Sequence, residues 1–91
     1  MVTAIVALKV DRKKVNDIAV QLSGMKSITE VYSVSGRYDL IAIVRTPDNE
    51  TMSDMVTGAM LKVDGIVDSE TMLAFRAYSK HDLDSMFSIG T

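Results

Sequence analysis

The stretch VYSVSGRYDLIAIV, residues 31–44, decides the fold. Both of its ends are rich in Val, Ile, Leu and Tyr, residue types that favour β-strands. Its middle, Ser35 to Asp39, places a glycine, which readily adopts a positive φ, among polar residues. We therefore expect an antiparallel hairpin from about Ile28 to Arg45, with its turn at residues 35–39.

Composition limits the class of protein. A chain of 91 residues forms one small domain. Its 47% hydrophobic content is high for that size, so we expect a second copy to cover part of the apolar surface. The 10 basic and 12 acidic residues are interspersed, with a formal charge of -2, which indicates no direct binding of nucleic acid. Because the chain has no cysteine, disulfides, thiolate metal centres and thiol nucleophiles are excluded.

The first residues, MVTAIVALK, are apolar but carry no basic leader. They predict a first β-strand rather than a signal peptide. No apolar run reaches the roughly 18–20 residues that a helix needs to cross a bilayer. We therefore expect a cytoplasmic protein that has no contact with membranes.

The patterns around the hairpin predict the other elements. Alternating apolar residues indicate a strand at 2–10, and a helix follows it with Asp11 as its cap. A second helix begins after Thr46 with Pro47 at its first position, or after Asp48. A last strand is expected at 66–78. The apolar stripes of the two helices are Val15, Ile18, Ala19 and Leu22, and Met52, Met55, Val56, Ala59, Met60 and Val63.

This order predicts an α+β fold, the ferredoxin-like βαββαβ sandwich. Its antiparallel four-stranded sheet carries both helices on one face, because both crossovers are right-handed. The other sheet face is also apolar, so we expect two copies to pack face to face as a dimeric α/β barrel. The residues predicted for that open face are Ile5, Ala7, Ile41 or Leu40, Met72 and Ala74.

We expect the ligand-binding domain to span residues 1–78 and a C-terminal tail to span 79–91. In the tail, the residues from Ser79 to Asp82 fit a capping box, which predicts a short helix from Asp82 to Phe87. Its apolar side chains can pack on a neighbour or cover an edge of the same chain.

No motif indicates a cofactor, a metal or a catalytic centre. His81 with Asp82 and Asp84 is a poor set for a transition metal, which usually has several nitrogen or sulfur ligands. The chain contains no G-x-S-x-G, G-x-G-x-x-G or Walker A pattern. Cofactor-independent proton abstraction by His81 or Asp39 is the enzymatic alternative that stays open.

The turn at residues 36–39 is the candidate ligand site. Backbone N–H groups near Gly36 can hold a carboxylate, and Asp39 can pair with an ammonium group, so together they match an α-amino acid. Hydroxyls of Ser69 and Thr71 can complete the polar set if a neighbouring subunit brings them close. The alternative is an ordinary hairpin in which glycine makes the turn and aspartate accepts a local hydrogen bond.

The sequence VYSVSGRYDL, followed after a helix by VDGIVDSET, resembles the effector-binding (RAM) domain of the Lrp/AsnC transcription regulators. The resemblance runs from Val2 to about Tyr78. It implies a βαββαβ domain that dimerises through its sheets and assembles dimers into octamer-like rings, with free amino acids bound between dimers. Carried over, the effector-contacting residues are Gly36, Tyr38 and Asp39 of one subunit and Ser69 and Thr71 of another. Ser69 stands where threonine is more usual.

Full-length regulators of this family carry a helix-turn-helix domain before the RAM domain, whereas here the first strand is expected at Val2. The resemblance thus implies a stand-alone RAM protein. We expect a homo-oligomeric, non-enzymatic module that binds an amino acid and regulates transcription or amino-acid metabolism, including by co-assembly with full-length Lrp/AsnC regulators. The alternatives are an ACT-like metabolic regulatory domain and a small enzyme of the dimeric α/β-barrel type.

Overall fold

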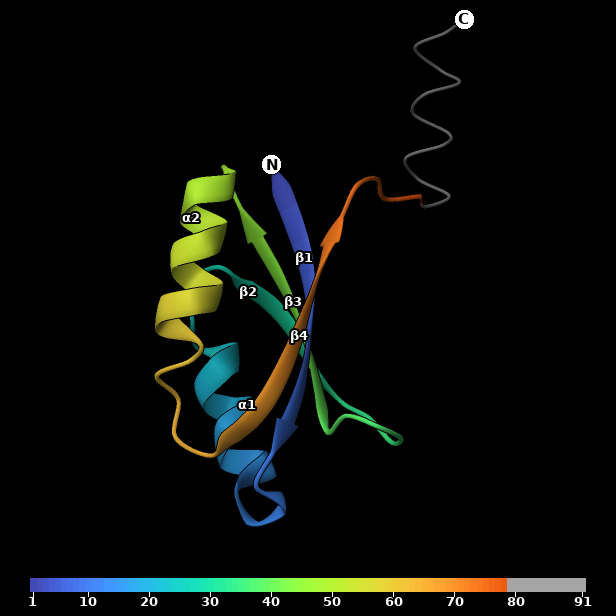
Figure 1. The fold of residues 1–91 in the computed structure, drawn as a ribbon, viewed down its shortest axis with the longest axis vertical. Helices are drawn as coiled ribbons and strands as arrows, with labels where there is room; N and C mark the ends of the chain where they lie inside the picture. The colour runs from blue at the N-terminus through green and yellow to red at the C-terminus, as the bar shows by residue number, and fades with distance from the viewer. Residues whose placement is uncertain (79–91) are drawn as a thin grey trace, which may run out of the picture.

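A computed structural model describes residues 1–78 of the chain, which form one four-stranded antiparallel sheet with two helices on one side (Figure 1). The strands lie in the order β2-β3-β1-β4. The predicted ferredoxin-like fold is confirmed. The expected tail at 79–91, with its helix at Asp82–Phe87, lies outside the described residues. The elements are β1 (Val2–Val10), α1 (Val15–Ser23), β2 (Ile28–Ser33), β3 (Leu40–Thr46), α2 (Asn49–Asp54) and β4 (Ile66–Ala74).

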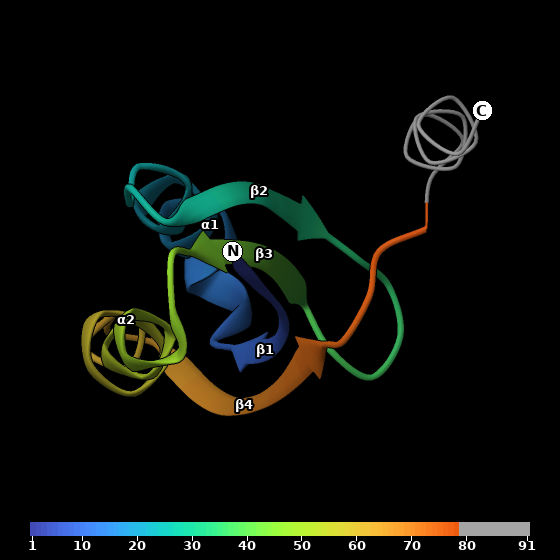
Figure 2. The same cartoon turned by 90° about the horizontal axis from the view of Figure 1, so that it is seen from above.

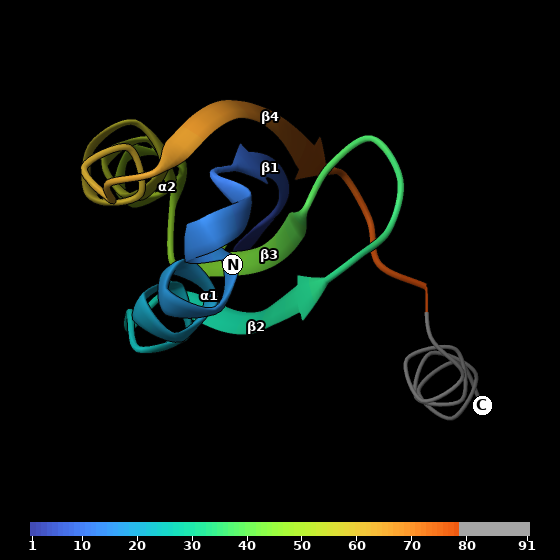
Figure 3. The same cartoon turned by 90° about the horizontal axis from the view of Figure 1, so that it is seen from below.

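The core lies between the sheet and the helices, which sit together on its concave side (Figures 2 and 3). Alternate residues of β1 and β3 point into it, as the period of two requires. The stripe predicted for the first helix is confirmed, with Ile18 and Leu22 buried and Val15 and Ala19 packed against them. The strand residues of this core are Ala4, Val6, Leu8, Val10, Ile28, Leu40, Ala42 and Val44.

Aspartate side chains begin both helices. Asp11 accepts a hydrogen bond from the Lys13 N–H at 3.1 Å, where a short 3₁₀ turn (Arg12–Lys14) leads into α1. Asp48 accepts one from the Thr51 N–H at 2.7 Å, so of the two predicted starts for α2 the aspartate is the cap. The bonds from Thr51 stabilise the charged carboxylate and lower the pKa of Asp48.

The apolar stripe predicted for the second helix is wrong at Ala59, which is exposed. After α2 the chain continues as one π-helical turn, Met55–Ala59. There the Met60 N–H donates to the Met55 carbonyl at 2.9 Å, five residues back instead of four. The wider turn rotates the following residues, so Met60 and Val63 face the core and Ala59 faces away from it.

The last strand is shorter than predicted and ends at Ala74 rather than Tyr78. Ala74 pairs with Thr3, one residue from the start of β1. Past Thr3 only Val2 of β1 remains, so the extended pattern that the sequence shows after Ala74 has no strand partner. Phe75 is accordingly 99% exposed.

The strand register identifies the face of the sheet that the helices leave open. Side chains of directly paired residues point to the same face, and Ile5 pairs with both Ile43 and Met72. Leu40 pairs with Leu8 and is fully buried under the helices, so Ile41 is the residue on the open face. The predicted members Ile5, Ala7, Ile41, Met72 and Ala74 all lie on that face, with Ile43 in addition.

Within residues 1–78 no helix is long and apolar enough to cross a membrane.

Replacing glycine by alanine is expected to have opposite effects on stability at Gly58 and at Gly65. Gly65 has φ +102°, and an added Cβ would lie 2.8 Å from Ile18 Cδ1. Gly65→Ala is therefore expected to lower the free energy of unfolding by about 1–3 kcal/mol. Gly58, in the π-helical turn, has open space around an added Cβ. Gly58→Ala should raise the free energy by about 0.4–1 kcal/mol.

Urea unfolding of both variants, followed by circular dichroism, measures these two changes. A destabilised Gly58→Ala protein would contradict the placement of that glycine, and an unchanged Gly65→Ala protein would contradict the positive φ.

Candidate functional site

The connection between β2 and β3, residues 34–39, lies at the end of the sheet where β1 finishes and β4 begins (Figure 1). The Val34 N–H donates to the Asp39 carbonyl at 3.0 Å and closes the connection at its base. Gly36, at its tip, is exposed and has φ +111°. The turn thus presents backbone in a conformation that favours glycine, on the side of the sheet away from the helices (Figure 2).

Asp39 is fixed to the central strand by two hydrogen bonds. Its N–H donates to the Leu8 carbonyl at 2.9 Å, and its Oδ2 accepts from the Val10 N–H at 2.9 Å. The side chain therefore replaces a strand partner for β1, which continues to Val10 past the first residue of β3. A carboxylate accepts hydrogen bonds at both oxygens, so this structural role leaves acceptor capacity for a ligand.

Tyr38 reaches across the sheet to a residue that the sequence reasoning missed. Its O–H donates to Glu70 Oε2 at 2.8 Å. This hydrogen bond, followed by burial and by the charge of Glu70, raises the pKa of Tyr38. Glu70 lies between Ser69 and Thr71 in the sequence, but only the register of β4 shows that it shares a face with the turn.

Ser69 and Thr71 point to the other face of the sheet. They pair with Leu8 and Val6, whose side chains are in the core, so their hydroxyls lie on the helix side of β4. Leu8 pairs with Leu40 on its other side, which places Ser69 two strand spacings, roughly 10 Å, from the start of β3. Within one chain the two hydroxyls are therefore not brought against Gly36 and Asp39.

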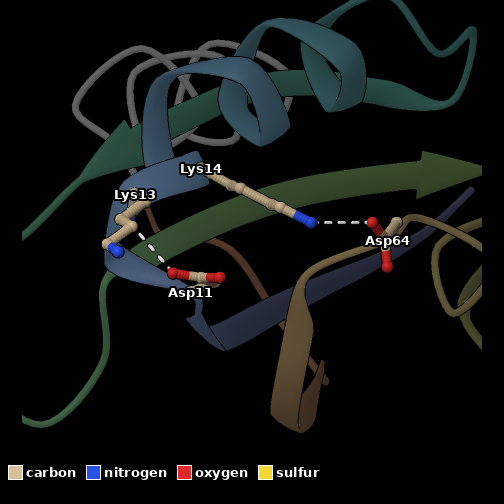
Figure 4. A network of polar contacts seen from close by, with 4 residues as sticks. All are labelled: Asp11, Lys13, Lys14 and Asp64. Carbon is tan, nitrogen blue, oxygen red and sulfur yellow. Dashed lines mark hydrogen bonds and ion pairs between the residues drawn. The ribbon is translucent and has the colours of Figure 1, made fainter.

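Polar contacts join the turn before α1 to the segment before β4, and Figure 4 shows the ion pair between Lys14 and Asp64. Lys14 Nζ donates to Asp64 Oδ2 at 2.8 Å, and the Asp11 N–H donates to the Gly65 carbonyl at 2.8 Å. The hydrogen bond between the side chains, with their opposite charges, raises the pKa of Lys14 and lowers the pKa of Asp64. Its stabilisation is therefore lost when pH falls through the pKa of Asp64 or rises through that of Lys14.

The metal set considered from the sequence, His81 with Asp82 and Asp84, lies outside the described residues. Among residues 1–78 no three His, Asp or Glu side chains are placed to hold a metal ion together.

Comparison with known proteins identifies the domain. The ferredoxin-like sheet does not by itself define a function, because this fold supports many unrelated ones. The family model described as the Lrp/AsnC ligand binding domain matches residues 3–83 of this chain. The chain belongs to this family, as the motifs around Gly36 and Ser69 predicted.

Individual relatives agree with the family. An uncharacterized HTH-type transcriptional regulator, PH1692 of Pyrococcus horikoshii, is 36% identical over 69 residues, which are 76% of this chain and 46% of the regulator. The chain thus spans about half the length of the curated relatives it matches. The crystal structure of TTHA0845 from Thermus thermophilus is 40% identical, with a TM-score of 0.81, covering 88% of this chain and 100% of that one.

A third match shares the fold at low identity. It is the transcriptional regulator NMB0573 of Neisseria meningitidis, solved as a complex with L-Met. It is 14% identical, with a TM-score of 0.77 over 86% of this chain and 52% of that one.

The role of Asp39 in the fold predicts a difference between two substitutions. Asp39→Ala leaves the Val10 N–H, in a residue that is 4% exposed, without its acceptor. The expected loss in free energy of unfolding is about 1–3 kcal/mol. Asp39→Asn keeps a carbonyl oxygen in that place and should lose less than half as much. Urea unfolding compares the two, and equal losses would show that the charge, rather than the acceptor, stabilises the end of β1.

Proposed function

We propose that this domain binds a free amino acid and regulates transcription or amino-acid metabolism as a homo-oligomer, without catalytic activity of its own. The observation that carries the proposal is the turn at residues 36–39. There a carboxylate, fixed by the Val10 N–H, lies three residues from an exposed glycine of positive φ. The family match favours this function over an ACT-like domain and over a barrel enzyme.

The chemistry of the turn suits an α-amino acid. Backbone N–H groups beside Gly36 bind the ligand carboxylate, and Asp39 accepts hydrogen bonds from the ligand ammonium group. Tyr38 belongs to the same turn. That NMB0573 was solved with L-Met supports this class of ligand, because the two proteins share the fold.

An assembly completes the site. Ser69 and Thr71 lie on the helix side of β4, and Thr71 is exposed, so the β4 of a neighbouring subunit can place its hydroxyls against the turn. In this proposal two copies first pack through their open sheet faces, and such dimers then join in an octamer-like ring. The ligand binds at the contact between dimers.

The names of the relatives support the regulatory role. The curated relatives are named as HTH-type transcriptional regulators, and this chain corresponds to about half of their length. It corresponds to the whole of the TTHA0845 chain. We propose that it acts as a ligand-binding module in the cytoplasm, and that it regulates by itself or by joining full-length Lrp/AsnC regulators, without contacting nucleic acid directly.

A screen of single amino acids tests the ligand. A ligand that binds only the native state stabilises it by mass action, by about 2.7 kcal/mol when the ligand concentration is one hundred times Kd. This stabilisation raises the melting temperature. We expect one amino acid or a few of similar side chain to raise the melting temperature at millimolar concentration. The absence of any shift with all twenty would reject amino-acid binding.

A substitution at Asp39 tests the proposed contact with the ligand ammonium group. Asp39→Asn keeps the acceptor for Val10 but removes the partner of the ammonium group, so we expect about ten-fold or greater weakening of Kd in calorimetry. The matched control is Asp17→Asn, the same change at an exposed position of α1. An Asp39→Asn protein that binds as tightly as the parent would refute the proposed ammonium contact.

The open sheet face predicts the dimer. Ile43 is in the middle of this face beside Ile5, so Ile43→Asp should place a charge in the interface and yield monomers in light scattering. Val20, which is 72% exposed on α1, supplies the control substitution Val20→Asp. A dimer that survives Ile43→Asp with unchanged mass would show that the copies meet elsewhere.

A further inference from the structure

The hydrogen bond between Tyr38 and Glu70 joins parts of the sheet that are not neighbours. Tyr38 precedes β3 and Glu70 lies in β4, while β1 runs between these strands. Adjacent strands are about 4.8 Å apart, so the two side chains together span roughly 10 Å across the open face. Glu70, at one end of the bond, is the direct partner of Ala7 in β1.

The open face is covered at Ala7, the residue that pairs with Glu70. Ala7 is on the open face but only 2% exposed, whereas Met72 on the same face is 46% exposed. Alanine is the smallest side chain that β1 places on this face, and it leaves room for the phenol ring above the strand. The bond between Tyr38 and Glu70 therefore reaches β4 beside the smallest side chain that β1 places on the open face.

The bond also connects the two halves of the proposed ligand site. At one end is the turn with Gly36 and Asp39, and at the other is Glu70, flanked in sequence by Ser69 and Thr71. Those two neighbours point to the helix side while Glu70 points to the open side. A displacement of the turn is thus transmitted to the backbone that carries both hydroxyls.

We propose that Tyr38 is a positioning residue, whose hydroxyl clamps the 34–39 turn to β4 through Glu70 and so couples the turn to the strand segment at Ser69–Thr71. The proposal rests on the proposed function for its ligand, but the clamp itself is a property of the free protein. It assigns a role to Glu70 and gives the hydroxyl of Tyr38 a partner other than the amino acid. The raised pKa of Tyr38 agrees with a hydroxyl proton held by a carboxylate.

Trypsin cleavage under native conditions tests the clamp without any ligand. Arg37 is exposed in the turn, and cleavage after it requires local opening. When reclosing is fast, the cleavage rate follows the population of the open form. Arg45, inside β3 and paired with Thr3, serves as the internal control, because its cleavage requires unfolding of the sheet. Mass spectrometry separates the two products.

We expect Tyr38→Phe and Glu70→Ala each to speed cleavage after Arg37 about five-fold, the factor for one hydrogen bond. The double variant should be no faster than either single variant, because both remove the same bond. Glu70→Gln, which keeps an acceptor oxygen, should remain near the parent rate. Additive effects, no effect, or an equal rise in cleavage after Arg45 would each overturn the clamp.

Ligand titration then separates the clamp from the proposed function. If an amino acid binds, Tyr38→Phe and Glu70→Ala should weaken its binding by the same factor. If the hydroxyl of Tyr38 contacts the ligand directly, only Tyr38→Phe weakens binding, and that result would overturn the positioning role. If no amino acid binds but the proteolysis result holds, the proposed function fails and the clamp stands.

Discussion

The last residues of β1 and Asp11, which follows them, form the hydrogen bonds on which the rest of the structure depends. The Leu8 carbonyl and the Val10 N–H bind the backbone and the carboxylate of Asp39, and the Asp11 N–H binds the Gly65 carbonyl. These bonds attach the hairpin on one side and the start of β4 on the other to the same three residues. The two segments that are proposed to bind ligand are therefore positioned by one strand end.

The size of the domain constrains how it can function. A single sheet covered on one side buries one layer of core, and its other face carries isoleucine, methionine and alanine. Residues 1–78 leave that face uncovered, which supports the proposal that two copies associate through it. The proposed site also requires a second copy, because its hydroxyls and its charged turn lie on different sides of one sheet. Assembly and ligand binding are thus expected to depend on each other.

Much of the fold and part of the site could be predicted from local patterns. Strand alternation, helix stripes and an aspartate cap led to the correct topology, because each depends on spacing along the chain. The turn at 36–39 was evident from composition. Glu70 was not, because its partnership with Tyr38 requires the register across three strands. The π-helical turn at Met55–Ala59 was also hidden, since no local pattern distinguishes it from an α-helix.

By itself the sequence determined the order of elements, the apolar open face and the family, since all three follow from residue type and spacing. The tertiary structure alone decided where β4 stops, because a strand needs a partner and β1 begins only at Val2. It also decided what the turn residues bind: Asp39 completes the end of β1, and Tyr38 reaches Glu70 across it. Such contacts depend on the positions of strands that are distant in the chain, which only the folded sheet brings together.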